Sequence, residues 1–269
     1  MLRIAWQGKH FGEEPPLVGN KSQGAGGIFF SGCNLYCVFC QNYQISQNNL
    51  GQNYSVEQTA QMMLALQKQG AVNINLVTPT IWQQPLREVI ILAKKQGLVI
   101  PIVWNSNGYE EVAGIKSLAG LVDIYLPDFK YADDSLADKY SGVKNYAVKA
   151  RLAIQEMISQ VGELQVKDGL AKQGVIVRHL ILPNNVKNSL AVLDLLAPLK
   201  EQIYFSLMSQ YYPAYQAKNF SELTRTITQA EFDQVFAKML AVGLDRGWTQ
   251  KLSSAANLLP DFTLTQPFK

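Results

Sequence analysis

Six apolar runs with the character of buried strands recur along the chain and alternate with stretches of helical pattern. Val, Ile, Leu and aromatic residues dominate each run, and polar or turn-forming residues bound it, which is typical of strands covered on both faces. The runs lie at residues 27 up to Cys33, 72–78, 98–105, 121–127, 174–183 and 202–208. The pattern therefore predicts six strands with a helix between each pair.

The helical intervals carry recognisable start and stop signals. Ser55 can cap a helix that runs through Gln69, with Gln58 three residues later as the reciprocal partner of a capping box. Three glycines stand just past a predicted helix and lead into the next strand: Gly70, Gly97 and Gly120. Glycine is the residue that most readily ends a helix.

Alternating helices and apolar strands are typical of a parallel sheet covered by helices. We predict an α/β fold with a partial (βα)6 barrel of parallel strands and outer helices. A doubly wound sheet is the alternative, because the order of elements along the chain does not fix the order of strands in the sheet. We expect the barrel at 27–244, an irregular N-terminal segment at 1–26 and a loosely structured C-terminal tail at 245–269.

Composition and charge narrow the classes of function. The 269 residues are 48% hydrophobic, which is enough for one large core, and the net charge of +3 is spread along the chain without Lys/Arg runs. We therefore expect no nucleic-acid partner. Since no run of about 18 apolar residues and no signal-peptide core is present, we also expect no membrane association and a cytoplasmic, reducing location.

The three cysteines carry the strongest chemical signal. Cys33, Cys37 and Cys40 lie within eight consecutive positions at the end of the first predicted strand, which favours shared metal ligation over disulfides. Three thiolates on a four-iron four-sulfur (4Fe–4S) cluster leave one iron free to bind another molecule. Zinc is the alternative, but it usually takes four N or S ligands, and neither His10 nor His179 stands at a usual zinc spacing from the cysteines.

The spacing C-x3-C-x2-C, with an aromatic residue before the last cysteine, resembles the signature of the radical S-adenosylmethionine (SAM) superfamily. Within that superfamily the chain resembles the pyruvate formate-lyase activating enzyme-like proteins over about residues 13–240. The similar stretches are EEP from Glu13, GGIFFSGCN, CQNYQIS, NINLVTPT, NSNGY, VDIYLPDFKYAD and VRHLILP. The resemblance implies that a 4Fe–4S cluster on the three cysteines binds SAM and cleaves it reductively to methionine and a 5'-deoxyadenosyl radical.

Residues at the carboxyl ends of the predicted strands are candidates for binding SAM, because a parallel barrel places its chemistry there. Strand geometry should point Asp128 and Lys130 to one side and Phe129 to the other. The first two resemble the Asp-x-Lys of activating enzymes, whose lysine meets the carboxylate of SAM. Arg178 should face the barrel interior, towards the carboxylate or ribose of SAM, while the adjacent His179 packs against a helix.

Other candidate positions depart from the pattern of the activating enzymes. Thr78 stands at the position of their glycine-rich motif, which binds the amino group of SAM, but it could equally belong to a plain strand-ending turn before Pro79. Asn105 and Ser106 replace an Asp-Thr pair; they could reach ribose hydroxyls, or simply form an Asn-Gly turn, and the lost carboxylate disfavours a bound monovalent cation. Gln210 replaces a histidine and cannot titrate. The predicted cofactor site is completed by two residues of the cysteine loop, Phe39 and Asn42.

The resemblance also implies partners. A low-potential electron donor of the flavodoxin or ferredoxin type would reduce the cluster, and a glycyl-radical enzyme would be the target. Radical chemistry on another peptide or small molecule is the second hypothesis, and a zinc-bearing binding module is the third. Three tyrosines after the sixth strand could line the substrate entrance or belong to a plain loop: Tyr211, Tyr212 and Tyr215.

Overall fold

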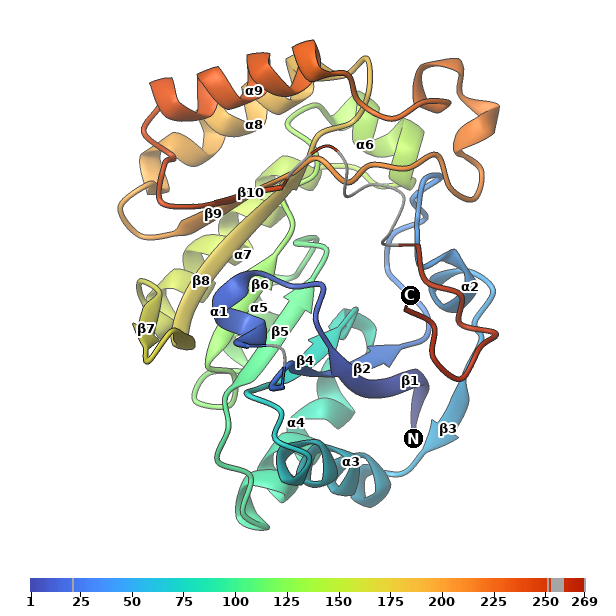
Figure 1. Ribbon diagram of the computed structural model, residues 1–269, viewed down its shortest axis with the longest axis vertical. Helices are drawn as coiled ribbons and strands as arrows, with labels where there is room; N and C mark the ends of the chain where they lie inside the picture. The colour runs from blue at the N-terminus through green and yellow to red at the C-terminus, as the bar shows by residue number, and fades with distance from the viewer. Residues whose placement is uncertain (21, 251, 253–258, 269) are drawn as a thin grey trace.

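A computed structural model describes residues 1–20, 22–250, 252 and 259–268. Within these residues, the six predicted strands follow one another as parallel neighbours across a curved sheet in chain order (Figure 1). They are β2 (Ala25–Phe30), β4 (Ile74–Val77), β5 (Ile102–Ser106), β6 (Ile124–Pro127), β8 (Leu170–Leu180) and β9 (Tyr204–Met208). Each coincides with one predicted apolar run. A doubly wound sheet would reverse its strand order, so the predicted partial barrel is confirmed.

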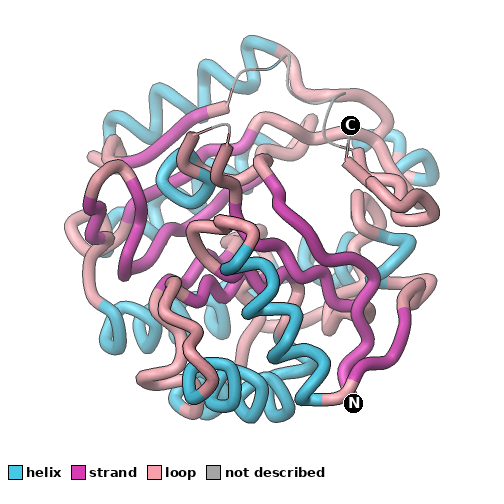
Figure 2. The backbone as a smooth tube through the Cα atoms, turned by 60° about the horizontal axis from the view of Figure 1, so that its bottom comes forward, coloured by secondary structure: helices cyan, strands magenta, loops and turns pink. Residues whose placement is uncertain are grey.

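Helices cover the outside of this sheet (Figure 2). They are α3 (Val56–Lys68), α4 (Gln83–Lys95), α5 (Val112–Lys116), α6 (Asp134–Ser141), α7 (Tyr146–Val161), α8 (Val186–Leu196) and α9 (Gln229–Ala241). Short 3-10 turns lie at Thr80–Trp82, Ala197–Leu199, Ala217–Asn219 and Ser221–Leu223. The predicted capping box begins α3, because the Gln58 N–H donates to Ser55 Oγ at 3.2 Å and the Ser55 N–H to Gln58 Oε1 at 2.8 Å. The three predicted helix-ending glycines all adopt a positive φ.

The prediction of an irregular N-terminal segment is wrong. Strand β1 (Leu2–His10) pairs antiparallel with β2 and with β3 (Gln52–Tyr54). Leu2 and Ile4 are buried while their neighbours are partly exposed, and this period-2 alternation is the signal of a half-buried strand, which a search for continuous apolar runs passes over. The chain then crosses to β8, where α1 (Pro15–Val18) packs (Figure 1).

The C-terminal tail is more structured than predicted where it is described. Strand β10 (Gly247–Thr249) adds to β9 in parallel. Outside the tail, one further strand, β7 (Gln165–Lys167), forms a hairpin with β8. The last described residues pack beside β1, since Trp6 Nε1 donates to the Thr265 carbonyl at 3.1 Å and the Trp6 and Phe268 rings lie 5.0 Å apart. Residues 251, 253–258 and 269 of the predicted tail lie outside the described residues.

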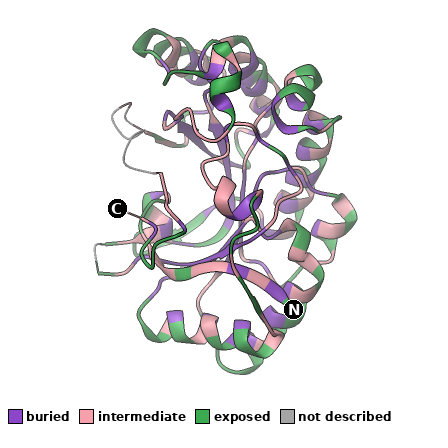
Figure 3. Cartoon of the chain, turned by 90° about the vertical axis from the view of Figure 1, so that its right-hand side faces the viewer, coloured by how far each residue is buried: buried purple, intermediate pink, exposed green. Residues whose placement is uncertain are grey.

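Alternate strand residues divide the core into two layers. Trp104 and Tyr125 belong to the layer beneath the outer helices, whereas Val103 and Ile124 point into the barrel and pack with Leu17 of α1. Figure 3 shows the strands largely buried and the helices exposed on one side. The barrel interior is therefore filled with apolar side chains at one end, and its polar residues gather at the carboxyl ends of the strands. No helix among the described residues is long and apolar enough to cross a membrane.

Candidate active site

A cavity of about 240 Å³ lies at the carboxyl ends of the parallel strands. All the residues predicted from the sequence as cluster or cofactor ligands line it. They are Cys33, Cys37, Phe39, Cys40, Asn42, Thr78, Asn105, Ser106, Asp128, Lys130, Arg178 and Gln210. These residues come from the cysteine loop and from the ends of successive strands, so the fold brings together positions that are up to 177 residues apart, the separation of Cys33 and Gln210 (210 − 33).

The cysteine loop joins β2 to α2 (Tyr43–Ser46) and is fastened to the last turn of α6. The Tyr36 N–H donates to the Ser141 carbonyl at 3.0 Å, and the Val38 N–H donates to the Tyr140 carbonyl at 2.8 Å. These carbonyls are unsatisfied within the helix because they belong to its C-terminal end. The loop thereby satisfies the end of α6, and the helix end fixes the middle cysteine.

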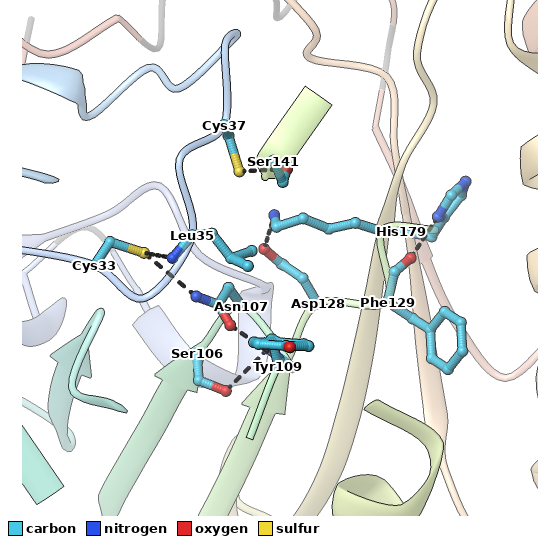
Figure 4. Close-up of polar contacts among 12 residues, drawn as sticks. Cys33, Leu35, Cys37, Ser106, Asn107, Tyr109, Asp128, Phe129, Ser141 and His179 are labelled. Carbon is cyan, nitrogen blue, oxygen red and sulfur yellow. Dashed lines mark hydrogen bonds and ion pairs between the residues drawn. The ribbon is translucent and has the colours of Figure 1, made fainter. Parts of the chain in front are cut away.

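Polar groups surround the sulfurs of the first two cysteines (Figure 4). The Leu35 N–H and the Asn107 side-chain amide point to Cys33 Sγ at 3.4 and 3.3 Å. Cys37 Sγ lies 3.0 Å from Ser141 Oγ. Sequence reasoning missed Asn107 and Ser141, although Asn107 lies in the NSNGY stretch that the family resemblance had marked.

The donor set fits an iron–sulfur cluster. Cys40 Sγ lies 3.2 Å from Ser46 Oγ, and burial raises the pKa of all three cysteine thiols, that of Cys37 to about 12. A thiolate in this cavity therefore needs a positive partner, which iron supplies. Among the described residues, no three His, Cys, Asp or Glu side chains converge on the position of a single ion.

The two histidines lie in different surroundings. His179 is fully buried on the outer face of β8, with Nδ1 2.7 Å from the Phe129 carbonyl and Nε2 2.8 Å from Ser189 Oγ of α8. Burial lowers its pKa to about 4. The prediction of a satisfied core histidine is confirmed. His10 lies in the cavity wall, but its ring packs against Phe268 at 4.4 Å, and burial lowers its pKa.

Asp128 and Lys130 both line the cavity, and Phe129 is buried on the opposite side, as strand geometry predicts. Lys130 Nζ lies 2.5 Å from Asp128 Oδ2. Burial disfavours the charged lysine, but the adjacent carboxylate outweighs this effect and raises its pKa, so Lys130 is a cation. The Tyr146 hydroxyl of α7 accepts a hydrogen bond from the main-chain N–H of Lys130 at 2.9 Å and donates to the Asn107 carbonyl at 2.7 Å. Tyr146 therefore joins the loop after β6 to the loop after β5.

Arg178 faces the cavity as predicted but is already engaged by the N-terminal segment. Its Nε donates to Glu14 Oε1 at 2.8 Å, and its Nη2 contacts a carboxylate oxygen of both Glu14 and Glu13. Glu13 also accepts from the Asn75 amide at 2.8 Å. Burial alone would raise the pKa of Glu13, but Arg178 and His10 lower it, so this carboxylate is ionised.

The remaining predicted residues form an uncharged part of the wall. Thr78 has a φ of 59°, unusual for a β-branched residue, and its N–H donates to the Asn105 carbonyl at 3.0 Å. The Gly108 N–H points to Ser106 Oγ at 3.3 Å, as in a polar turn. The Gln210 side chain accepts from Gln250 at 2.8 Å. This part of the wall offers neutral donors and acceptors.

The three tyrosines after β9 do not line the cavity as it is formed by the described residues. Tyr211 is buried, and its hydroxyl donates to the Leu223 carbonyl at 2.8 Å. Tyr215 stacks on Tyr43 with ring centroids 5.0 Å apart. Tyr211 and Tyr215 thus pack the loop after β9, and a role of the three tyrosines at the substrate entrance stays a prediction.

Comparison with known proteins decides the family. The sequence profile of the Radical SAM superfamily matches residues 28–196, which is more than half of the chain and includes the three cysteines. The chain belongs to the radical SAM superfamily. Radical SAM proteins use a 4Fe–4S cluster and SAM, and these are accordingly the cofactors of this chain.

Curated relatives of this radical SAM chain include an uncharacterized protein of Methanocaldococcus jannaschii, 32% identical over 245 residues that cover 88% of this chain and 66% of that protein. The pyruvate formate-lyase-activating enzyme of Clostridium pasteurianum is 24% identical over 161 residues, or 58% of this chain and 61% of that protein. The chain thus spans less than two thirds of the length of either relative.

Among solved structures, SuiB of Streptococcus suis bound to the precursor peptide SuiA is similar with a TM-score of 0.58. The match covers 85% of this chain and 49% of that chain at 12% identity. At this identity the likeness concerns the fold alone, and it agrees with a partial barrel of parallel strands.

Proposed function

We propose that this radical SAM enzyme activates a partner by abstracting a hydrogen atom from a glycine residue of a glycyl-radical enzyme. The observation that carries the proposal is the convergence of three thiols, the Asp128–Lys130 pair and a neutral polar wall on one cavity. The similarity to the activating enzyme of Clostridium pasteurianum supports the choice of target. When bound, the cluster and SAM supply an adenosyl radical that can abstract hydrogen.

In this proposal the cysteine loop holds the cluster through Cys33, Cys37 and Cys40. The fourth iron then has no protein ligand and is open to SAM. Lys130 carries three N–H donors, and Asp128 accepts one of them. The other two are available to the carboxylate of SAM, while Asp128 holds the ammonium in place.

The uncharged wall would position the rest of SAM and exclude water. Asn105, Ser106 and Gln210 line the cavity and would offer hydrogen-bonding groups to the ribose and adenine. Thr78 also lines the cavity and, by the family resemblance, would lie near the amino group of SAM. Phe39 and Asn42 contribute from the cysteine loop. Bound SAM and a target that covers the cavity would keep water from a radical that would otherwise react with its surroundings.

The enzyme needs an electron from outside, because none of its side chains can supply one at a low potential. We propose a flavodoxin or ferredoxin as the donor. The three thiols must stay reduced until iron binds, which favours a reducing compartment such as the cytoplasm.

The first experiment tests the chemistry. Anaerobically reconstituted protein should hold about four irons, and with dithionite it should convert SAM to 5'-deoxyadenosine and methionine. The Cys37→Ala variant should lose the reducible cluster and the 5'-deoxyadenosine. No 5'-deoxyadenosine above a cluster-free control would contradict radical SAM chemistry in this chain.

The second experiment tests the target. The reduced enzyme, SAM and a purified glycyl-radical enzyme are mixed, and electron paramagnetic resonance (EPR) should record a glycyl radical that depends on SAM. If 5'-deoxyadenosine forms without any glycyl radical, the target is another peptide or a small molecule, which is the alternative function.

A further inference from the structure

Two buried hydroxyl groups form a chain that ends on one cysteine sulfur. The Tyr131 hydroxyl lies 2.7 Å from Ser141 Oγ, and Ser141 Oγ lies 3.0 Å from Cys37 Sγ. Tyr131 and Ser141 have no exposed surface and Cys37 is 8% exposed. Water therefore does not compete for these hydrogen bonds. They link the Cys37 sulfur, which lines the cavity, to the buried Tyr131 hydroxyl.

The direction of these hydrogen bonds follows from the chemistry of the two end groups, the Tyr131 hydroxyl and the Cys37 sulfur. A cysteine sulfur bound to iron is a thiolate and can only accept a hydrogen bond, so Ser141 must donate to Cys37. The Ser141 oxygen then accepts from Tyr131. Burial raises the pKa of Tyr131 well above its usual range, so its proton is retained. The order is Tyr131 to Ser141 to Cys37.

The backbone around Ser141 holds this geometry. Ser141 is the last residue of α6, and the helix closes at Gly142, which has a φ of 67°. The main-chain carbonyls of Ser141 and Tyr140 accept N–H groups from the residues on either side of Cys37. The hydroxyl and the sulfur are thus held together by three contacts between the same two segments.

The other two sulfurs are approached differently. Cys40 Sγ lies near Ser46 Oγ at 3.2 Å, and the next contact of that hydroxyl is a long one, 3.4 Å from Gln47 Nε2. Cys33 Sγ is approached by amide N–H groups at 3.3 and 3.4 Å. The shortest contact to a sulfur, and the one backed by a second buried hydroxyl, is at Cys37.

We propose that Ser141, supported by Tyr131, raises the reduction potential of the cluster through its hydrogen bond to Cys37. Reduction adds one electron from a low-potential donor, and part of the added negative charge falls on the ligand sulfurs. A donor to such a sulfur stabilises the reduced state more than the oxidised state. No bond at Ser141 or Tyr131 forms or breaks, and no proton moves. Ser141 is a positioning residue that acts through Cys37, whatever the target of the enzyme.

The test is an anaerobic redox titration of the reconstituted protein with dithionite, followed by EPR, without SAM or substrate. Ser141→Ala should make the cluster about tenfold harder to reduce, which corresponds to a midpoint potential about 59 mV lower for one electron. Tyr131→Phe should lower the midpoint potential less, because Ser141 can still donate. As the control, Ser135→Ala changes an exposed serine of the same helix and should leave the potential unchanged.

A Ser141→Ala protein with a full cluster and the parent potential would overturn the proposal. So would a Ser141→Ala protein that builds no cluster, if Tyr131→Phe builds one with the parent potential, because the hydroxyls would then only hold the loop. The readout is independent of the glycyl-radical proposal, since a protein that activates no partner still has a midpoint potential to measure.

Discussion

Lys130, which is partly buried, and Arg178, which is buried, are cations in the wall of the same cavity, but their carboxylate partners reach them in different ways. Lys130 pairs with Asp128, two residues away at the end of the same strand, at 2.5 Å. Arg178 pairs with Glu14 and Glu13, which come from the segment between β1 and α1. The first pair is balanced in charge, whereas the second group carries one negative charge in excess.

The difference separates a cation with one local partner from a cation that also holds the fold. Lys130 uses one of its three N–H donors on Asp128. Three of the five N–H donors of Arg178, on Nε and Nη2, are directed at two carboxylates of the N-terminal segment, which leaves the two on Nη1 and offsets the charge of the guanidinium twice. Arg178 therefore fastens the N-terminal segment across the barrel, a role that its predicted contact with SAM did not include. Lys130 is the better candidate for the SAM carboxylate.

We expect the largest effect on stability from a substitution of Arg178. Arg178→Met leaves two buried carboxylates without a cation, so the free energy of unfolding should fall by about 3–5 kcal/mol. Urea denaturation followed by circular dichroism measures it. The triple variant Glu13→Gln, Glu14→Gln, Arg178→Met removes the charges together and should recover much of the loss. A fall below about 1 kcal/mol in Arg178→Met would show that the ion pairs do not fasten the segment.

The matching change at Lys130 should act on binding. A charge-assisted hydrogen bond contributes about 1.5–3 kcal/mol, so Lys130→Met should weaken SAM binding by roughly ten- to a hundred-fold. The cluster should remain, as iron content and the EPR signal will report. Isothermal titration calorimetry of the cluster-bound protein gives the affinity. An affinity and a cleavage rate equal to those of the parent would remove Lys130 from the SAM site.

These two cations also mark what the sequence can and cannot predict. Strand alternation predicts that Asp128 and Lys130 share one face and that Arg178 and His179 lie on opposite faces. The choice of Arg178 for the cavity also needed the chemistry of a guanidinium and the family resemblance, and the three cysteines follow from their spacing. Glu13 and Glu14 belong to a stretch that the resemblance covers, yet their pairing with Arg178 depends on where β1 carries the chain. Tyr146 and Ser141 are similar cases, because their partners are set by the packing of α7 and α6 and not by any local motif.

The opposite faces of β8 should also respond differently to pH. His179 is neutral when folded, and its pKa is lowered from 6.5 to about 4. As the pH falls from 7 to 5, the unfolded chain takes up this proton and the folded chain does not, so stability should fall by about 1–2 kcal/mol. Glu13 has a lowered pKa, so the stability from its pairing with Arg178 is lost only at lower pH.

Urea denaturation of the parent at several pH values between 7 and 5 checks this expectation. His179→Gln removes the titrating group and should flatten the dependence of stability on pH over this range, even though the variant starts from a lower stability. An equal slope in His179→Gln and in the parent would assign the pH dependence to other groups, and the Arg178 cluster would be the first to examine.

The smallest effect is expected at Thr78, in the uncharged wall of the cavity. Its φ of 59° lies in the left-handed region, which costs an ordinary residue roughly 1–2 kcal/mol. Glycine adopts this conformation freely but loses about 0.5–1 kcal/mol more conformational entropy on folding. Thr78→Gly should therefore raise the free energy of unfolding by up to about 1 kcal/mol, whereas Thr78→Ala keeps the strain and should give no gain.

SAM affinity distinguishes two uses of the position. If the backbone alone shapes the amino-group site, Thr78→Gly binds SAM as tightly as the parent. If the hydroxyl contacts SAM, both variants bind SAM more weakly. A Thr78→Gly protein that is less stable than Thr78→Ala would show that the left-handed backbone is not a source of strain here.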